Sequence, residues 1–135
     1  MASILVVDDD ADIAENLAEL LHAEGHEVRI ASHGQEALGL LATKLPDLVL
    51  LDVEMPVLTG PEMAFRMLVH DRGPEEIPVV LVSGVLGLGS VAALVGTPYY
   101  FAKPFRVEAI RRLVNRALVE RTRTAPPLRR ARSRP

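Results

Sequence analysis

The sequence predicts an α/β domain in which a parallel β-sheet carries helices on both faces. Short apolar runs alternate with segments of helical periodicity five times along the chain, which is typical of a doubly wound parallel sheet. Most of these runs are continuously apolar, as expected for strands that are buried on both faces. Polar residues follow four of the five runs, at the edge where parallel sheets bind ligands.

The first half of the chain contains three predicted strands and two predicted helices. A run rich in β-branched residues predicts the first strand. Apolar residues then recur at helical spacing until Gly25, which suits the end of a helix. The same arguments place the other elements. The expected order is strand Ile4–Val7, a helix over 13–21, strand Val28–Ala31, helix Gly34–Thr43 and strand Leu48–Leu51.

The second half of the chain continues the alternation. A loop over 53–60 precedes Pro61, which suits the first position of a third helix. Residues 77–102 carry no charge, but prolines and glycines interrupt this stretch, so a membrane span is not expected. We expect instead strand Ile77–Val82, a glycine-rich loop with a short helix, strand Tyr99–Ala102 and a final helix over 107–118.

Composition and charge restrict the class of protein. The 135 residues suit one globular domain, and the absence of cysteine excludes disulfide frameworks, Cys-ligated metals and thiol catalysis. The start of the chain lacks the features of a secretory signal, so we expect a cytoplasmic protein. Residues 1–119 contain 9 Lys and Arg against 17 Asp and Glu, whereas 120–135 contain 6 Arg and 1 Glu. We therefore expect a folded domain over 1–121 and a basic, disordered tail or linker over 122–135, the only part suited to nucleic acid.

A specific set of polar side chains falls at the carboxyl ends of the predicted strands. Three aspartates over 8–10 follow the first strand, Asp52 follows the third, and Ser83 and Lys103 follow the fourth and fifth. Clustered carboxylates repel one another unless a cation neutralises them, and Mg²⁺ prefers such oxygen ligands. One ionised carboxylate can then attack phosphorus and form an aspartyl phosphate, while lysine and serine contact the phosphoryl oxygens.

Four motifs in this order resemble the receiver domain of two-component response regulators. They are VVDDDADI after the first strand, LLDVEMPVLTG around Asp52, LVSG at Ser83 and YYFAKPF at Lys103. The resemblance covers residues 3 to about 120. The protein resembles most a receiver of the chemotaxis-regulator kind, which either stands alone or forms the N-terminal part of a longer regulator. This resemblance implies a flavodoxin-like sheet with strand order 2-1-3-4-5.

The resemblance implies a role for each site residue. Asp52 is the implied phosphoacceptor, and Ser83 and Lys103 are the implied contacts of the phosphoryl group. The bond between Lys103 and Pro104 is expected to be cis. The implied ligands of Mg²⁺ are Asp9, Asp52 and the backbone carbonyl of Glu54, with Asp8 as a ligand either directly or through water.

The resemblance also implies a switch and a set of partners. On phosphorylation Ser83 moves inward and Tyr100 follows, so the surface of the fourth helix, fifth strand and fifth helix changes. Strand alternation agrees, because it sends Tyr99 and Phe101 to the core and leaves Tyr100 free. The implied phosphodonor is a sensor histidine kinase or a histidine phosphotransfer protein. A downstream protein receives the signal, and the receiver, a monomer or phosphorylation-dependent dimer, catalyses only its own phosphorylation and slow dephosphorylation.

Simpler interpretations remain for several residues. Asp10 suits the N-cap of the first helix, with Asp12 in its first turn. His22 and His26 have the spacing of a metal-binding pair, but the helix is expected to end between them, which favours packing or solvation. Glu54 either tunes the lifetime of the phosphoryl group or is an ordinary loop charge.

Two alternative functions remain. One follows from a segment that departs from the receiver family, and the other from a partial match to a different family. The segment GVLGLGSVAALVG is apolar and glycine-rich where the family has an acidic amphipathic helix, so we expect a short, frayed or mobile fourth helix with an apolar binding patch. This departure suggests a receiver-like interaction module that acts without phosphorylation. A phosphatase of the haloacid dehalogenase type is the other alternative. Asp8 and Asp10 match its Asp-x-Asp pattern only loosely, and it leaves Asp52 unexplained.

Overall fold

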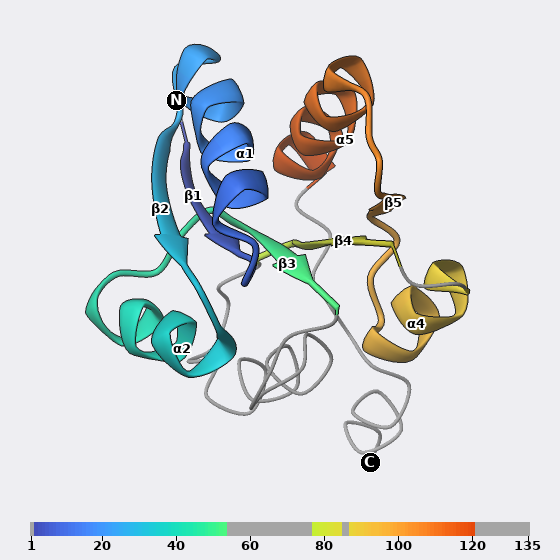
Figure 1. Ribbon diagram of the computed structural model, residues 1–135, viewed down its shortest axis with the longest axis horizontal. Helices are drawn as coiled ribbons and strands as arrows, with labels where there is room; N and C mark the ends of the chain where they lie inside the picture. Colours follow the sequence, from blue (N-terminus) through green and yellow to red (C-terminus); the bar gives the residue numbers. More distant parts are fainter. Residues whose placement is uncertain (1, 54–76, 85–86, 121–135) are drawn as a thin grey trace.

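Strands and helices alternate along the chain in the computed structural model, which describes residues 2–53, 77–84 and 87–120 (Figure 1). The strands are β1 (Ser3–Val7), β2 (Glu27–Ala31), β3 (Leu48–Asp52), β4 (Val79–Ser83) and β5 (Tyr100–Ala102). The helices are α1 (Ala11–Ala23), α2 (Gly34–Thr43), α4 (Leu88–Val95) and α5 (Val107–Glu120). The loop 53–60 beyond Val53, the third helix predicted after Pro61 and the basic tail 122–135 lie outside the described residues.

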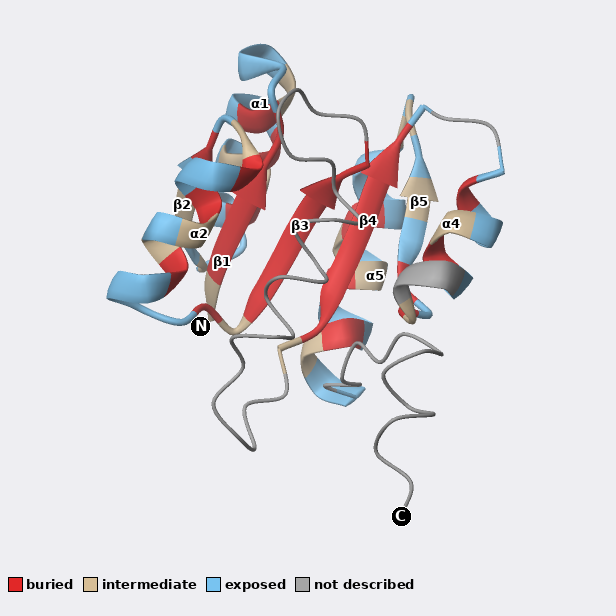
Figure 2. Ribbon diagram, turned by 90° about the horizontal axis from the view of Figure 1, so that it is seen from below, coloured by how far each residue is buried: buried red, intermediate tan, exposed pale blue. Residues whose placement is uncertain are grey.

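The strands form one parallel sheet in the order β2-β1-β3-β4-β5, which confirms the predicted fold class. Val7 lies opposite Ala31 on one side and Leu51 on the other, and Leu51 lies opposite Leu81. Because all five strands run in one direction, their carboxyl ends reach the same edge of the sheet, as the arrowheads in Figure 2 show.

Helices cover both faces of the sheet. On β1, Leu5 and Val7 contribute to the core that includes residues of α2 and α4. Ile4 and Val6 point to the opposite face and share a core with α1 and α5. Figure 1 shows α1 and α5 on one side of the sheet and α2 and α4 on the other. The central strands are therefore buried on both faces, which explains their continuous apolar sequences (Figure 2).

The ends of α1 follow the predicted signals. The Asp10 carboxylate accepts hydrogen bonds from the backbone N–H groups of Asp12, at 3.0 Å, and Ile13, at 3.2 Å. This confirms Asp10 as the N-cap of the helix. Gly25 follows the end of α1 with a φ of +91°, a conformation that glycine adopts without strain.

The uncharged stretch 77–102 contains β4, the short helix α4 and β5, as predicted, although β4 spans Val79–Ser83 rather than the expected Ile77–Val82. Among the described helices, none is long and apolar enough to cross a membrane. The expected strand Tyr99–Ala102 begins one residue late, at Tyr100, and the N–H of Tyr99 donates to the Thr97 hydroxyl at 3.1 Å. Helix α4 has 8 residues and follows Gly87, whose φ is +74° and which supplies no side-chain cap.

Candidate functional site

The polar residues predicted for the site lie together at the carboxyl edge of the sheet. Asp8 follows β1 directly, Asp52 is the last residue of β3, and Ser83 is the last residue of β4. Lys103 follows β5 directly. Since β1, β3, β4 and β5 are consecutive neighbours in the sheet, these four positions meet although they are far apart in the sequence.

Three carboxylates form a cluster at this edge. One carboxylate oxygen from each of Asp8, Asp9 and Asp52 lies within 4.8 Å of the others. Asp8 and Asp52 are buried, with 2% and 5% of their surfaces exposed, whereas Asp9 is exposed to solvent. Burial of two like charges beside a third is unfavourable unless positive charge compensates it. The cluster is therefore suited to a cation, and its ligand atoms are the hard oxygens that divalent metal ions such as Mg²⁺ prefer.

Lys103 supplies part of the compensating charge. Its Nζ lies 2.9 Å from Asp8 Oδ2 and 3.8 Å from Asp52 Oδ1. The Lys103 side chain is mostly buried, so its ammonium group is held near the carboxylates rather than solvated. Its closer partner is Asp8, and the ammonium group also remains within range of Asp52.

Backbone hydrogen bonds hold the site residues in place. The second oxygen of Asp8, Oδ1, accepts the N–H of Asp10 at 2.9 Å, which orients the carboxylate at the start of α1. The N–H of Lys103 donates to the backbone carbonyl of Ser83 at 3.0 Å, which joins the ends of β4 and β5. Ser83 is 2% exposed. The peptide bond between Lys103 and Pro104 is cis.

The three aromatic residues at β5 separate by face. Tyr99 is fully buried between the sheet and α5, and Phe101 packs on the same side, where its ring meets Phe105 edge to face at 5.6 Å. Tyr100 points to the other face and is 45% exposed. This agrees with the alternation expected of a strand. Glu54, whose carbonyl was expected to bind metal, lies outside the described residues.

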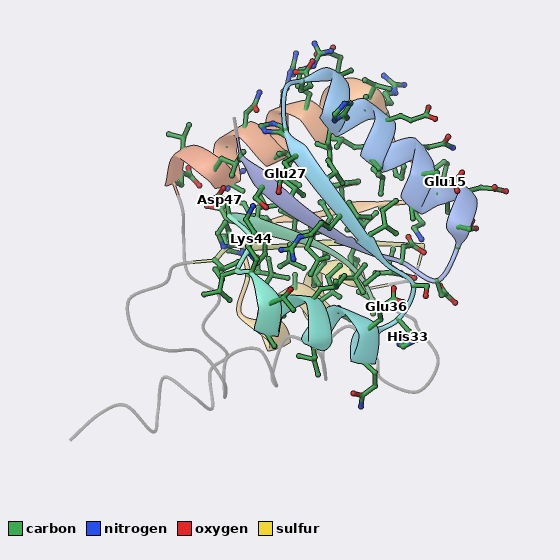
Figure 3. The ribbon with its side chains drawn as sticks, turned by 90° about the vertical axis from the view of Figure 1, so that its left-hand side faces the viewer. Glu15, Glu27, His33, Glu36, Lys44 and Asp47 are labelled. Carbon is green, nitrogen blue, oxygen red and sulfur yellow. The ribbon has the colours of Figure 1, made fainter. Side chains whose placement is uncertain are left out.

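Two residues make contacts that the sequence patterns did not indicate. Thr97 is buried, and its hydroxyl donates to the Val79 carbonyl, which joins the loop before β5 to β4. His33 is the N-cap of α2, where its Nδ1 accepts the N–H of Glu36 at 3.2 Å (Figure 3). The position of His33 before a helical pattern was a usable signal, although histidine is not a typical capping residue.

The histidine pair does not converge on a metal site. His26 Nδ1 accepts the backbone N–H of Ala2 at 3.2 Å, while His22 lies exposed in the last turn of α1. Among the described residues, the side chains that come together in a group of three or more able to bind a metal ion are those of Asp8, Asp9 and Asp52.

Comparisons with known proteins agree with this geometry. The family model of the response regulator receiver domain matches residues 4–115. Sporulation initiation phosphotransferase F of Bacillus subtilis is 37% identical over 117 residues, which cover 85% of this chain and 92% of that protein. Response regulator MprA of Mycobacterium tuberculosis is 37% identical over 123 residues, which cover 89% of this chain. The match spans 51% of MprA, about half its length.

Solved receiver structures share the fold. The receiver domain of NtrX from Brucella abortus matches with a TM-score of 0.76 and 34% identity, over 86% of this chain and 98% of that one. Chemotaxis protein CheY4 of Vibrio cholerae matches with a TM-score of 0.76 and 28% identity over the same shares. The chain thus belongs to the family of response regulator receiver domains, which act in two-component signal transduction.

Proposed function

We propose that this receiver takes a phosphoryl group onto Asp52 from a phosphohistidine on a sensor kinase or a histidine phosphotransfer protein. The observation that carries the proposal is the cluster of Asp8, Asp9 and Asp52 beside the Lys103 ammonium group at one edge of the sheet. A nucleophilic carboxylate, a cation site and a lysine held beside them are the parts that phosphoryl transfer requires.

The cluster fits Mg²⁺, because its ligand atoms are carboxylate oxygens. Asp8, Asp9 and Asp52 would bind the ion, together with the backbone carbonyl of Glu54. When bound, Mg²⁺ neutralises charge on the carboxylates and on the incoming phosphoryl oxygens. A cation of this kind accounts for two buried aspartates lying close to a third, an arrangement that is otherwise unfavourable.

In the proposed reaction, a carboxylate oxygen of Asp52 attacks the phosphorus of the phosphohistidine. A phosphorus–oxygen bond forms as the phosphorus–nitrogen bond breaks. The electron pair of the broken phosphorus–nitrogen bond returns to the imidazole ring. Lys103 Nζ, which is 3.8 Å from Asp52 Oδ1, pairs with one phosphoryl oxygen. The Ser83 hydroxyl, at the end of the neighbouring strand, donates to another. Hydrolysis reverses the modification when water attacks phosphorus and inorganic phosphate leaves, so the only reactions catalysed are on the receiver itself.

Signalling in this proposal follows from the position of Ser83 and Tyr100 on adjacent strands. As Ser83 turns toward the phosphoryl group, Tyr100 moves inward, and the surface formed by α4, β5 and α5 changes for a downstream protein. The receiver unit comprises residues 1–121, acts in the cytoplasm and is a monomer or a phosphorylation-dependent dimer. The basic segment 122–135 is a separate element, and nucleic acid is a partner only through it.

The test is phosphorylation by acetyl phosphate and Mg²⁺, followed by intact-mass measurement. Wild-type protein is expected to gain one phosphoryl group, and Asp52→Asn to gain none, because the amide is not a nucleophile. EDTA is expected to prevent the gain. Asp12→Asn is the matched control, because Asp12 is an exposed aspartate of α1 outside the cluster and should leave the gain unchanged.

Three results would contradict the proposal. A phosphoryl group that persists in Asp52→Asn would assign the acceptor elsewhere, and turnover of a phosphomonoester that depends on Asp8 but not on Asp52 would favour a phosphatase. If neither acetyl phosphate nor a phosphorylated histidine phosphotransfer domain modifies the wild type, the protein acts as an interaction module without phosphorylation.

A further inference from the structure

The side chain of Tyr100 lies directly over Gly89, in the first turn of α4. A Cβ atom on Gly89 would be 3.3 Å from Tyr100 Oη and 3.6 Å from its Cζ. Helix α4 and strand β5 are neighbours in the fold (Figure 1). The phenol ring therefore occupies space that the side chain of any other residue at position 89 would enter.

Backbone conformation does not explain this glycine. Gly87 has a positive φ, whereas Gly89 belongs to the helix and does not. Glycine within a helix lowers its stability relative to alanine, so the residue at 89 has a cost without a conformational benefit. What distinguishes Gly89 is the close approach of another side chain. Gly39, in the interior of α2, has no atom within 4 Å of its Cβ position.

The contact lies on the face of the sheet toward which Ser83 points. Tyr100 lies opposite Leu81 in the register of β4 and β5, and Ser83 follows two residues later on β4. Residues two apart on a strand share a face, so Ser83, Leu81 and Tyr100 all point toward the side of the sheet that carries α4. A movement of Tyr100 toward Ser83 would take its ring away from Gly89.

We propose that Gly89 is a positioning residue: because it has no side chain, it leaves room for Tyr100 to lie exposed over α4, in what we call the outward state. Gly89 thereby sets the balance between this state and the inward state, in which Tyr100 has moved toward Ser83. The proposal rests on the proposed function of Asp52 and Tyr100. A side chain at 89 crowds the outward position alone, because the inward ring has left the contact. By linkage, whatever destabilises the outward state strengthens the binding of any ligand that selects the inward state.

The first test measures the affinity for fluoroberyllate, a phosphoryl mimic, in the presence of Mg²⁺. Gly89→Ala is expected to bind it about two- to tenfold more tightly than wild type. The effect is modest because the crowding is only a few tenths of an ångström and the exposed phenol can shift to relieve part of it. Gly39→Ala is the matched control, because it makes the same substitution in a helix where no neighbour is near. It should leave the affinity unchanged.

A double-mutant cycle separates positioning of Tyr100 from simple stabilisation of α4. The effect of Gly89→Ala on fluoroberyllate affinity is expected to disappear in a Tyr100→Ala background, since the crowded ring is then absent. An effect of equal size in both backgrounds would overturn the proposal, because it would show that alanine acts through the helix.

A second readout needs no ligand. The chain contains two tyrosines, so fluorine NMR of fluorotyrosine-labelled protein gives one signal for Tyr100 and one for the buried Tyr99 as internal reference. Gly89→Ala is expected to reduce the solvent isotope shift of the Tyr100 signal and to leave Tyr99 unchanged. An unchanged Tyr100 signal would overturn the proposal. If wild type fails to bind fluoroberyllate but Gly89→Ala still moves Tyr100, the proposed function fails and the role of Gly89 stands.

Discussion

At the scale of single residues, the charge of Lys103 is shared unequally between two aspartates. Its Nζ is 2.9 Å from Asp8 and 3.8 Å from Asp52. Asp8 is also one of the three aspartates that form the potential cation site. An ammonium group and a metal ion therefore compete for the same carboxylate, and each weakens the binding of the other by charge repulsion.

This competition predicts opposite effects of Lys103→Met on two measurements. Methionine retains an apolar stem of similar length but removes the charge. Mg²⁺ binding, measured by calorimetry, should tighten about three- to tenfold, because about 1 kcal/mol of repulsion is relieved. Phosphorylation by acetyl phosphate should slow, because a phosphoryl oxygen loses its cationic partner.

The control for this prediction is Lys44→Met. Lys44 pairs with Glu27 at 2.8 Å on the surface, beside α2 and β2 rather than at the carboxylate cluster (Figure 3). Lys44→Met should change neither the Mg²⁺ affinity nor the rate of phosphorylation by acetyl phosphate. Equal Mg²⁺ affinities of Lys103→Met and wild type would show that Lys103 and the ion do not compete.

At the scale of elements, a hydrogen bond connects the end of α5 to Tyr99, the residue that precedes β5. Its buried ring carries a hydroxyl that donates to Glu120 Oε1 at 2.7 Å. Arg116 pairs with the same oxygen at 3.3 Å, and its guanidinium group lies over the Tyr99 ring, 5.3 Å from the centroid. The hydrogen bond from Tyr99 is the main reason that the pKa of Glu120 lies below its usual value, and Arg116 adds to it. The last turn of α5, which would otherwise fray, is therefore held by the residue that precedes β5.

Tyr99→Phe is expected to loosen this end of the helix alone. The substitution retains the ring and removes the hydroxyl, so amide hydrogen exchange should accelerate in the last turn of α5 and not in α1. The pKa of the Glu120 carboxyl, followed by NMR titration, should rise toward its usual value. Tyr100→Phe is the matched control, and similar protection in both variants would mean that the hydroxyl does not hold the helix.

At the scale of the whole molecule, one histidine links stability to pH. His26 follows α1, and its Nδ1 accepts the N–H of Ala2, just before β1, at 3.2 Å. Protonation would replace this acceptor with a donor. Burial is the largest cause that holds the pKa of His26 below its usual value of 6.5. The unfolded chain therefore binds this proton more readily than the folded protein does.

The free energy of unfolding should consequently fall as the pH decreases below about 6.5, and this loss should level off once the pH is below the folded pKa. Chemical denaturation at a series of pH values from about 5 to about 8 measures it. In His26→Asn the amide oxygen can accept the same N–H without titrating, so its stability should decline less over this range. If the free energy of unfolding changes with pH in the same way in wild type and His26→Asn, His26 has no role in this pH dependence.

The whole molecule also shows what the sequence predicted and what it left open. Periodicity, glycines and capping residues are local signals, and they predicted the sheet, its helices and the Asp10 cap. The predicted start of the last strand was wrong by one residue, because a hydrogen bond between the Tyr99 backbone and the Thr97 side chain is not visible in periodicity. The set of residues at the site was predictable because strand ends in a parallel sheet converge whatever the connecting segments contain.

Local patterns in the chain were enough to predict the fold class, the order of the elements and which residues reach the carboxyl edge. Which of these residues touch depends on how the elements pack in the folded molecule. Lys103 pairs with Asp8 across 95 positions of sequence, Tyr99 meets Glu120, and Tyr100 lies over Gly89. Such contacts depend on the separation of elements and on side-chain rotamers, which packing sets as the elements come together and which no local pattern encodes.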